Sequence, residues 1–152
     1  GMRINELVSI KKQDIRLEEG LIKVLGKGNI ERQVIIGSFA KKSLKKYLKN
    51  EAVAHSKYLF PSNRKNSKVG HVSIRKPYGD IKKYLLLATG NDALTPHSIR
   101  HSTATHLLEN GTDLISVKEI MGHSSLASTQ VYTHVQKEHM SKVYNQAHPE
   151  GN

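Results

Sequence analysis

Residues 94–108, LTPHSIRHSTATHLL, contain the clearest helix signal in the chain. Thr95 can cap the free backbone N–H groups of a helix start, and proline, here Pro96, is favoured at the first helical position. The helix is expected to run to Asn110, because Gly111 then supplies a C-terminal stop. The sequence therefore predicts a helix from Pro96 to Asn110.

Two faces of this helix carry different information. Ile99, Thr103 and Leu107 recur every four residues, which predicts that their face packs in the core. His97 and Arg100 are three residues apart, share a face and lie in the first turns. Free N–H groups and the helix dipole favour an anion there, so the pair is a candidate phosphate clamp. A surface or capping histidine is the structural alternative for His97.

A metal site is the competing interpretation of the same histidines. His97 and His101 are spaced as helical neighbours, and His106 follows on the same helix. The sequence contains no HExxH pattern and places no carboxylate to complete a zinc site. We therefore expect no metal and no cofactor.

The segments around this helix predict an α+β fold, mainly α, with one small antiparallel sheet. Two aliphatic runs, 21–25 and 32–36, flank the glycine-containing turn 26–29 and indicate a β-hairpin. Further helices and strands are expected at 2–12 (helix), 15–17 (strand), 38–50 (basic helix with Ser38 as N-cap), 58–61 (strand or turn), 71–88, 114–121, 126–133 and 137–146 (helices).

Charge and composition restrict the functional classes. The 152 residues include 24 lysines and arginines against 13 aspartates and glutamates, for a net charge of +11. A domain this basic usually meets a polyanion, most often nucleic acid, although a solubilising lysine coat is the plain alternative. The absence of cysteine excludes disulfides and thiolate sites. No apolar run approaches a membrane span, so a cytoplasmic protein is expected.

A second chemical motif occupies residues 121–135, MGHSSLASTQVYTHV. His123 follows a glycine that ends one expected helix, and Tyr132 comes nine residues later. A tyrosine has a pKa near 10, so as a nucleophile it needs cations or a base nearby. The residues alone give no reason to prefer Tyr132 over Tyr84 or Tyr144.

Four segments of the chain together resemble the catalytic domain of tyrosine recombinases of the phage integrase type, the Xer-type enzymes most closely. They occur in the family's order and cover nearly the whole chain: 1–7 (GMRINEL), 26–32 (GKGNIER), 94–108 and 121–135. The resemblance implies the family's helical DNA breaking-rejoining fold and site-specific DNA recombination or integration.

The resemblance also implies a role for each matching residue. Arg3 and Arg100 would grip the scissile phosphate, and His97 and His123 would add hydrogen bonds. Lys27 would protonate the leaving 5′ oxygen, and Tyr132 would form a 3′-phosphotyrosyl bond. Among the predicted catalytic residues, Arg3, Lys27 and Arg100 would also bind DNA.

The same resemblance suggests roles for Glu6 and for the tail of the chain. Glu6 matches an acidic position expected to orient its neighbours, and its alternative is an ordinary helix-face carboxylate. The tail 136–152 resembles the segment that family members dock onto a neighbouring subunit, and its alternative is a frayed end. Lys27 without the resemblance would be a solvent-exposed turn lysine.

The resemblance finally sets the domain organisation and the partners. Residues 1–152 correspond to the C-terminal catalytic domain, truncated at its N-terminus and lacking the family's core-binding domain, so weak activity is expected. Double-stranded DNA and other protomers, four on paired sites, would be the partners. The alternatives are a type IB topoisomerase, a non-catalytic DNA-binding module and a metal-dependent nuclease, the last disfavoured because no carboxylate cluster is present.

Overall fold

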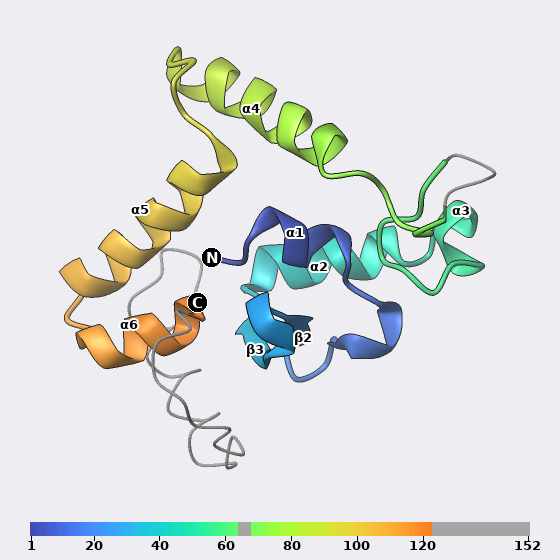
Figure 1. The fold of residues 1–152 in the computed structure, drawn as a ribbon, viewed down its shortest axis with the longest axis horizontal. Helices are drawn as coiled ribbons and strands as arrows, with labels where there is room; N and C mark the ends of the chain where they lie inside the picture. The colour runs from blue at the N-terminus through green and yellow to red at the C-terminus, as the bar shows by residue number, and fades with distance from the viewer. Residues whose placement is uncertain (64–67, 123–152) are drawn as a thin grey trace.

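A computed structural model describes residues 1–63 and 68–122 of the chain (Figure 1). The expected helices at 126–133 and 137–146 lie outside the described residues, as do His123, Tyr132 and the tail. The helices, strands and contacts of the structure are those of the described residues.

The N-terminal half forms a three-stranded antiparallel sheet in the order β1-β2-β3. Its elements are α1 (Ile4–Val8), η1 (Lys12–Asp14), β1 (Ile15–Arg16), β2 (Leu21–Leu25), η2 (Lys27–Asn29) and β3 (Glu31–Ile35). The predicted hairpin is therefore confirmed, with β3 starting one residue earlier than expected. Gly28 has φ 77° in the connecting turn, a backbone conformation that residues other than glycine rarely adopt.

The helix predicted over 2–12 was too long. Helix α1 ends at Val8, and the chain continues in an extended form in which Lys11 bridges Tyr58. Ile10 accepts a hydrogen bond from the Leu59 N–H at 2.9 Å and is 3% exposed. Pairing with the 58–61 segment buries Ile10 against the sheet, and this long-range contact overrides the helical pattern.

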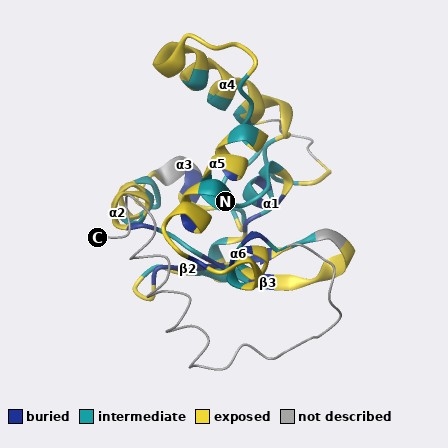
Figure 2. Cartoon of the chain, turned by 90° about the vertical axis from the view of Figure 1, so that its left-hand side faces the viewer, coloured by how far each residue is buried: buried dark blue, intermediate teal, exposed yellow. Residues whose placement is uncertain are grey.

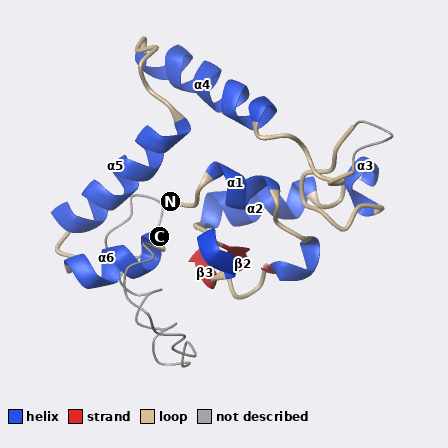
Figure 3. Ribbon diagram, viewed as in Figure 1, coloured by secondary structure: helices blue, strands red, loops and turns tan. Residues whose placement is uncertain are grey.

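After the sheet, the described residues from 38 to 122 are mainly helical (Figure 3). Its elements are α2 (Ser38–Tyr47), α3 (Glu51–Ala54), α4 (Arg75–Thr89), α5 (Pro96–Glu109) and α6 (Leu114–Met121). The expectation that Ser38 caps α2 was wrong, because Gly37 occupies the N-cap position. Helix α4 begins at Arg75, later than predicted. It tolerates Pro77 because the first turn leaves backbone N–H groups unpaired anyway.

Helices α5 and α6 confirm their predicted ends. Thr95 is the N-cap of α5, and the Ser98 hydroxyl accepts a hydrogen bond from its N–H at 3.1 Å. Asp113 caps α6 by accepting from the Ile115 and Ser116 N–H groups, and the Ser116 hydroxyl bond is the largest cause of its lowered pKa. Gly122 ends α6 with φ 64°.

The predicted buried face of α5 needs a correction. Leu107 is 0% exposed, as expected, and Thr103 is half-buried, but Ile99 is 45% exposed. The second buried residue of the helix is Arg100, at 6%. Arg100 therefore takes the buried place that was expected for Ile99, and a guanidinium group lies on the inner side of the helix.

Two apolar clusters form the core of the described residues, whose buried stretches are dark blue in Figure 2. The first contains Ile10, Ile22, Val24, Val34 and Leu59 and joins the sheet to α1 and α2. The second contains Leu107, Val117 and Met121 and joins α5 to α6. The N-terminus lies between α1 and the α5–α6 pair (Figure 1). Residues 1–6 therefore contact both the sheet cluster and the end of α6. Within the described ranges, no helix is long and apolar enough to cross a membrane.

Leu107→Ala tests the second cluster. We expect it to lower the free energy of unfolding by about 2–5 kcal/mol, because it opens a cavity at a fully buried site. The neighbouring Leu108 is 42% exposed, so Leu108→Ala should change stability by less than about 0.5 kcal/mol. Urea denaturation of both variants provides the measurement, and equal losses would contradict this placement of the core.

Candidate active site

The first predicted arginine is held by a buried carboxylate on its own helix. The Glu6 Oε2 atom accepts the Arg3 backbone N–H at 2.6 Å, and its Oε1 atom accepts Arg3 Nη1 at 3.1 Å. Arg3 Nη2 donates to the Gly122 carbonyl at 3.1 Å. Glu6 is 3% exposed, whereas 36% of the Arg3 side chain is exposed. Glu6 thus contacts Arg3 as an orienting carboxylate would, and Arg3 remains accessible to a ligand.

A second arginine of the site, Arg32 on β3, was missed in the sequence analysis. Its Nη2 atom donates to Glu6 Oε2 at 2.9 Å, and only 5% of its side chain is exposed. Arg32 lies opposite Val24 in the sheet register, on the face that also carries Val34. A charged residue in phase with these valines was the sequence signal for it.

Arg100 reaches the same place from α5. Its Nη1 atom donates to the Gly1 carbonyl and its Nη2 atom to the Met121 carbonyl. The chain start, the end of α6 and the first part of α5 therefore converge on one guanidinium group. Carbonyls at the end of a helix carry partial negative charge, which suits this cation.

The site concentrates positive charge. The guanidinium groups of Arg3, Arg32 and Arg100 lie around the single carboxylate of Glu6. Burial, and after it the charges of Arg3 and Arg32, lower the pKa of Arg100 to about 10, while the charge of Glu6 opposes the shift. Arg100 stays charged at neutral pH despite the repulsion. A bound anion would relieve that repulsion, so the arrangement favours phosphate.

The other predicted catalytic residues are placed only in part. His97 is exposed in the first turn of α5, one turn before Arg100. Lys27 begins η2 at the tip of the β2–β3 hairpin. His123 directly follows Gly122, whose carbonyl accepts from Arg3, but it lies outside the described residues, as does Tyr132. The structure thus unites Arg3 and Arg100 and leaves the remaining geometry as a prediction.

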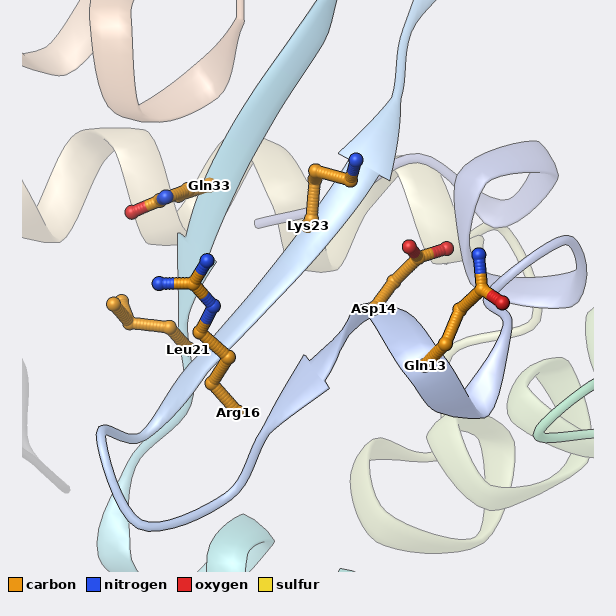
Figure 4. Close-up of a pocket in the computed structure, with 6 residues that line it drawn as sticks. All are labelled: Gln13, Asp14, Arg16, Leu21, Lys23 and Gln33. Carbon is orange, nitrogen blue, oxygen red and sulfur yellow. The ribbon is translucent and has the colours of Figure 1, made fainter.

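A shallow hollow on the outer side of the sheet lies apart from this cluster (Figure 4). It is lined by Gln13, Asp14, Arg16, Leu21, Lys23 and Gln33 and includes none of the predicted site residues. No group of three or more His, Asp or Glu side chains able to hold a metal ion occurs in residues 1–63 and 68–122. The arginine cluster is therefore the feature of the described chain that best suits the predicted chemistry.

Comparison with known proteins identifies the family of the chain. Residues 1–139 match the model of the phage integrase family. The tyrosine recombinase XerC of Natranaerobius thermophilus is 41% identical over 158 residues, covering 98% of this chain and 52% of that protein. The tyrosine recombinase XerD of Staphylococcus haemolyticus is 42% identical, covering 98% and 51%. The chain thus spans about half the length of these relatives.

Solved structures give the same result. The XerA recombinase superposes with a TM-score of 0.70 at 34% identity, covering 97% of this chain and 52% of that one. The XerH recombinase bound to its palindromic difH substrate, in a post-cleavage complex, superposes with a TM-score of 0.68 at 30% identity, covering 95% and 41%. These matches extend over nearly all of the sequence that carries the four motifs. The chain therefore belongs to the phage integrase family, with the fold of the tyrosine recombinase catalytic domain.

Proposed function

We propose that this chain supplies the catalytic domain of a site-specific DNA recombinase that cleaves and rejoins strands through Tyr132. The observation that carries the proposal is the cluster of Arg3, Arg32 and Arg100 around the buried Glu6. Such preorganised charge stabilises the negative charge that develops on a phosphate during transfer. The relative XerH, solved with its difH substrate, supports double-stranded DNA as the partner.

The resemblance implies the roles of Tyr132, His97 and Lys27 in the proposed reaction. The Tyr132 oxygen attacks the scissile phosphorus, so that a phosphotyrosyl bond forms and the bond to the 5′ oxygen breaks. The Tyr132 proton leaves with help from His97, and Lys27 gives a proton to the departing 5′ oxygen. The energy of the phosphodiester stays in the new bond. A 5′-hydroxyl can therefore attack it in the reverse reaction, which rejoins the strand.

Arg3 and Arg100 would bind the non-bridging oxygens of that phosphate. Arg3 has a side chain exposed enough to do so. Arg100 is nearly buried, with hydrogen bonds to the carbonyls of Gly1 and Met121, so DNA would have to displace one of these acceptors. Catalytic hydrogen bonds often reach their final geometry only when substrate is bound.

The assembly follows from the reaction. Exchange between two duplexes requires four cleavages, so four protomers on paired sites are the expected active form. The tail 136–152, which resembles the docking segment of the family, would join them. A chromosomal or mobile-element DNA substrate places the protein in the cytoplasm.

The test uses nicked duplexes with a randomised central segment, from which the cleaved fragment diffuses away and leaves the protein trapped. The expected result is a protein–DNA adduct that survives denaturing gel electrophoresis and forms equally in EDTA, because side chains supply the charge. Sequencing the trapped DNA identifies the site. The cleaved end should be a free 5′-hydroxyl that polynucleotide kinase can label.

Other results would point to other functions. DNA cutting that EDTA abolishes would indicate a metal-dependent nuclease. Trapping without sequence preference, together with relaxation of supercoiled plasmid, would indicate a type IB topoisomerase. If no adduct forms, the assay is repeated with the chain extended at its N-terminus to the length of its relatives. If the extended chain also forms no adduct, the remaining interpretation is a non-catalytic DNA-binding module.

A further inference from the structure

Arg32 is a charged residue on the inward face of a strand. In β3 the buried positions alternate, and Arg32 and Val34 are the two that face inward. Taking a guanidinium ion out of water costs several kcal/mol unless it is paired and hydrogen-bonded. A leucine or valine would fill the same place at no such cost, so the arginine calls for an explanation in the reaction that the domain is proposed to perform.

The contacts of Arg32 lead to the accessible arginine of the site. Its Nη2 atom donates at 2.9 Å to the same Glu6 oxygen that accepts the Arg3 backbone N–H at 2.6 Å. The other Glu6 oxygen accepts Arg3 Nη1 at 3.1 Å. Glu6 is therefore fixed from two sides, and the direction of the Arg3 guanidinium depends on where Glu6 is held.

The Arg32 side chain also packs against the end of α6. A Cβ atom added to Gly122 would collide with Nε and Cδ of Arg32, so this close approach requires glycine. Gly122 is the last described residue before His123, and its carbonyl accepts from Arg3. The place where the chain leaves α6 is thus bounded by Arg32 on one side and Arg3 on the other.

The hairpin that carries Lys27 is tied to the same carboxylate. A Cβ atom added to Gly26 would lie 3.7 Å from Glu6 Oε1, which places the first residue of the turn beside Glu6. Gly26 also donates its N–H to the Ile30 carbonyl at 2.8 Å and closes the turn. Arg32 follows Ile30 by two residues, so one short hairpin brings both Lys27 and the Glu6–Arg32 pair to the site.

We propose that Arg32 is a positioning residue of this reaction. This role rests on the function proposed above. Arg32 holds Glu6 and packs against the backbone at Gly122, and through Glu6 it sets the direction of the Arg3 guanidinium. We assign Arg32 no contact with the phosphate, because it is buried and paired with the buried carboxylate of Glu6, whereas Arg100 is bonded to neutral carbonyls that DNA could displace. The role uses the whole guanidinium group, whose Nη2 atom meets Glu6 while Nε lies against Gly122, and the compact ammonium of lysine cannot make both contacts.

The experiment compares Arg32→Lys and Arg32→Met with wild type on the DNA selected by trapping. Cleavage rate at saturating DNA, the Kd for DNA and the melting temperature are measured for each. Both variants should remain folded and bind DNA within about threefold of wild type. Their cleavage rates should fall about 10- to 100-fold, because small misplacements of catalytic groups have effects of this size. Arg16, an exposed arginine of the same sheet, provides the control, and Arg16→Lys should cleave at the wild-type rate.

A double variant separates positioning from bulk stability. If Arg32 acts through Glu6, adding Arg32→Lys to Glu6→Gln should cost less than about threefold further, because coupled groups are not additive. A folded Arg32→Lys that cleaves like wild type, losses that multiply in the double variant, or failure of both single variants to fold would each overturn the inference. If neither wild type nor the chain extended to the length of its relatives forms an adduct, the proposed function itself is overturned, and the inference with it.

Discussion

Replacing Tyr132 with phenylalanine is expected to abolish the covalent protein–DNA product. The phenolic oxygen is the atom proposed to bond to phosphorus, and phenylalanine lacks it while keeping the ring. DNA affinity should stay within about twofold of wild type, because most binding comes from contacts of basic groups with the phosphates. The adduct is measured by denaturing electrophoresis and the affinity by gel shift.

Tyr84 offers a matched control for this variant. It lies on α4, is 70% exposed, and could not be distinguished from Tyr132 as a nucleophile by residue type alone. Tyr84→Phe should form the adduct at the wild-type rate. An adduct of normal yield with Tyr132→Phe would show that another group attacks the DNA.

The second large effect is expected from Arg100→Lys. Lysine keeps the positive charge but loses the fork that can grip a phosphate with two parallel hydrogen bonds. We expect cleavage to slow by about 10²–10³-fold, the usual cost of one donor that stabilises a developing anion. Single-turnover trapping at saturating DNA measures this rate.

The control for Arg100→Lys is an arginine outside the cluster. Arg75 begins α4 and is exposed, so Arg75→Lys should leave the cleavage rate unchanged. The melting temperature of Arg100→Lys must also be compared, because Arg100 is buried and bonded to the Gly1 and Met121 carbonyls. A folded Arg100→Lys that cleaves within threefold of wild type would contradict the assignment of Arg100 to the phosphate.

The elements that the sequence predicted well are those whose ends are set by local chemistry. Thr95 and Pro96 start α5, and Gly122 ends α6, through capping geometry that depends on a few adjacent residues. The hairpin was likewise predictable because Gly28 supplies the positive φ of its turn. Local signals of this kind do not depend on the rest of the fold.

The elements that differed depend on contacts far along the chain. Helix α1 stops early because Ile10 pairs with Leu59, a partner that no local pattern indicates. Helix α5 turns Arg100 inward and leaves Ile99 45% exposed, although the apolar pattern favoured the opposite. Burial of a charge is unfavourable by itself, and it persists here because Arg100 donates to the carbonyls of Gly1 and Met121 and the charge of Glu6 favours the charged form.

Part of the candidate site could be predicted from the sequence and part could not. Resemblance supplied Arg3 and Arg100, and the structure brings them together around Glu6. Arg32 was overlooked, although it shares strand phase with Val34 and so was placed to face the core. A charged residue in an apolar phase is a usable signal for a buried ion pair, and its partner could be found only in three dimensions.

Peptide mapping of the trapped adduct identifies the residue that attacks the DNA. The wild-type protein is bound covalently to its selected DNA, digested with nuclease and protease, and the modified peptide is sequenced by mass spectrometry. We expect a nucleotide joined through its 3′ phosphate to the oxygen of Tyr132, with a free 5′-hydroxyl on the cleaved strand. A nucleotide on any other residue, or one joined through a 5′ phosphate, would contradict the proposed reaction.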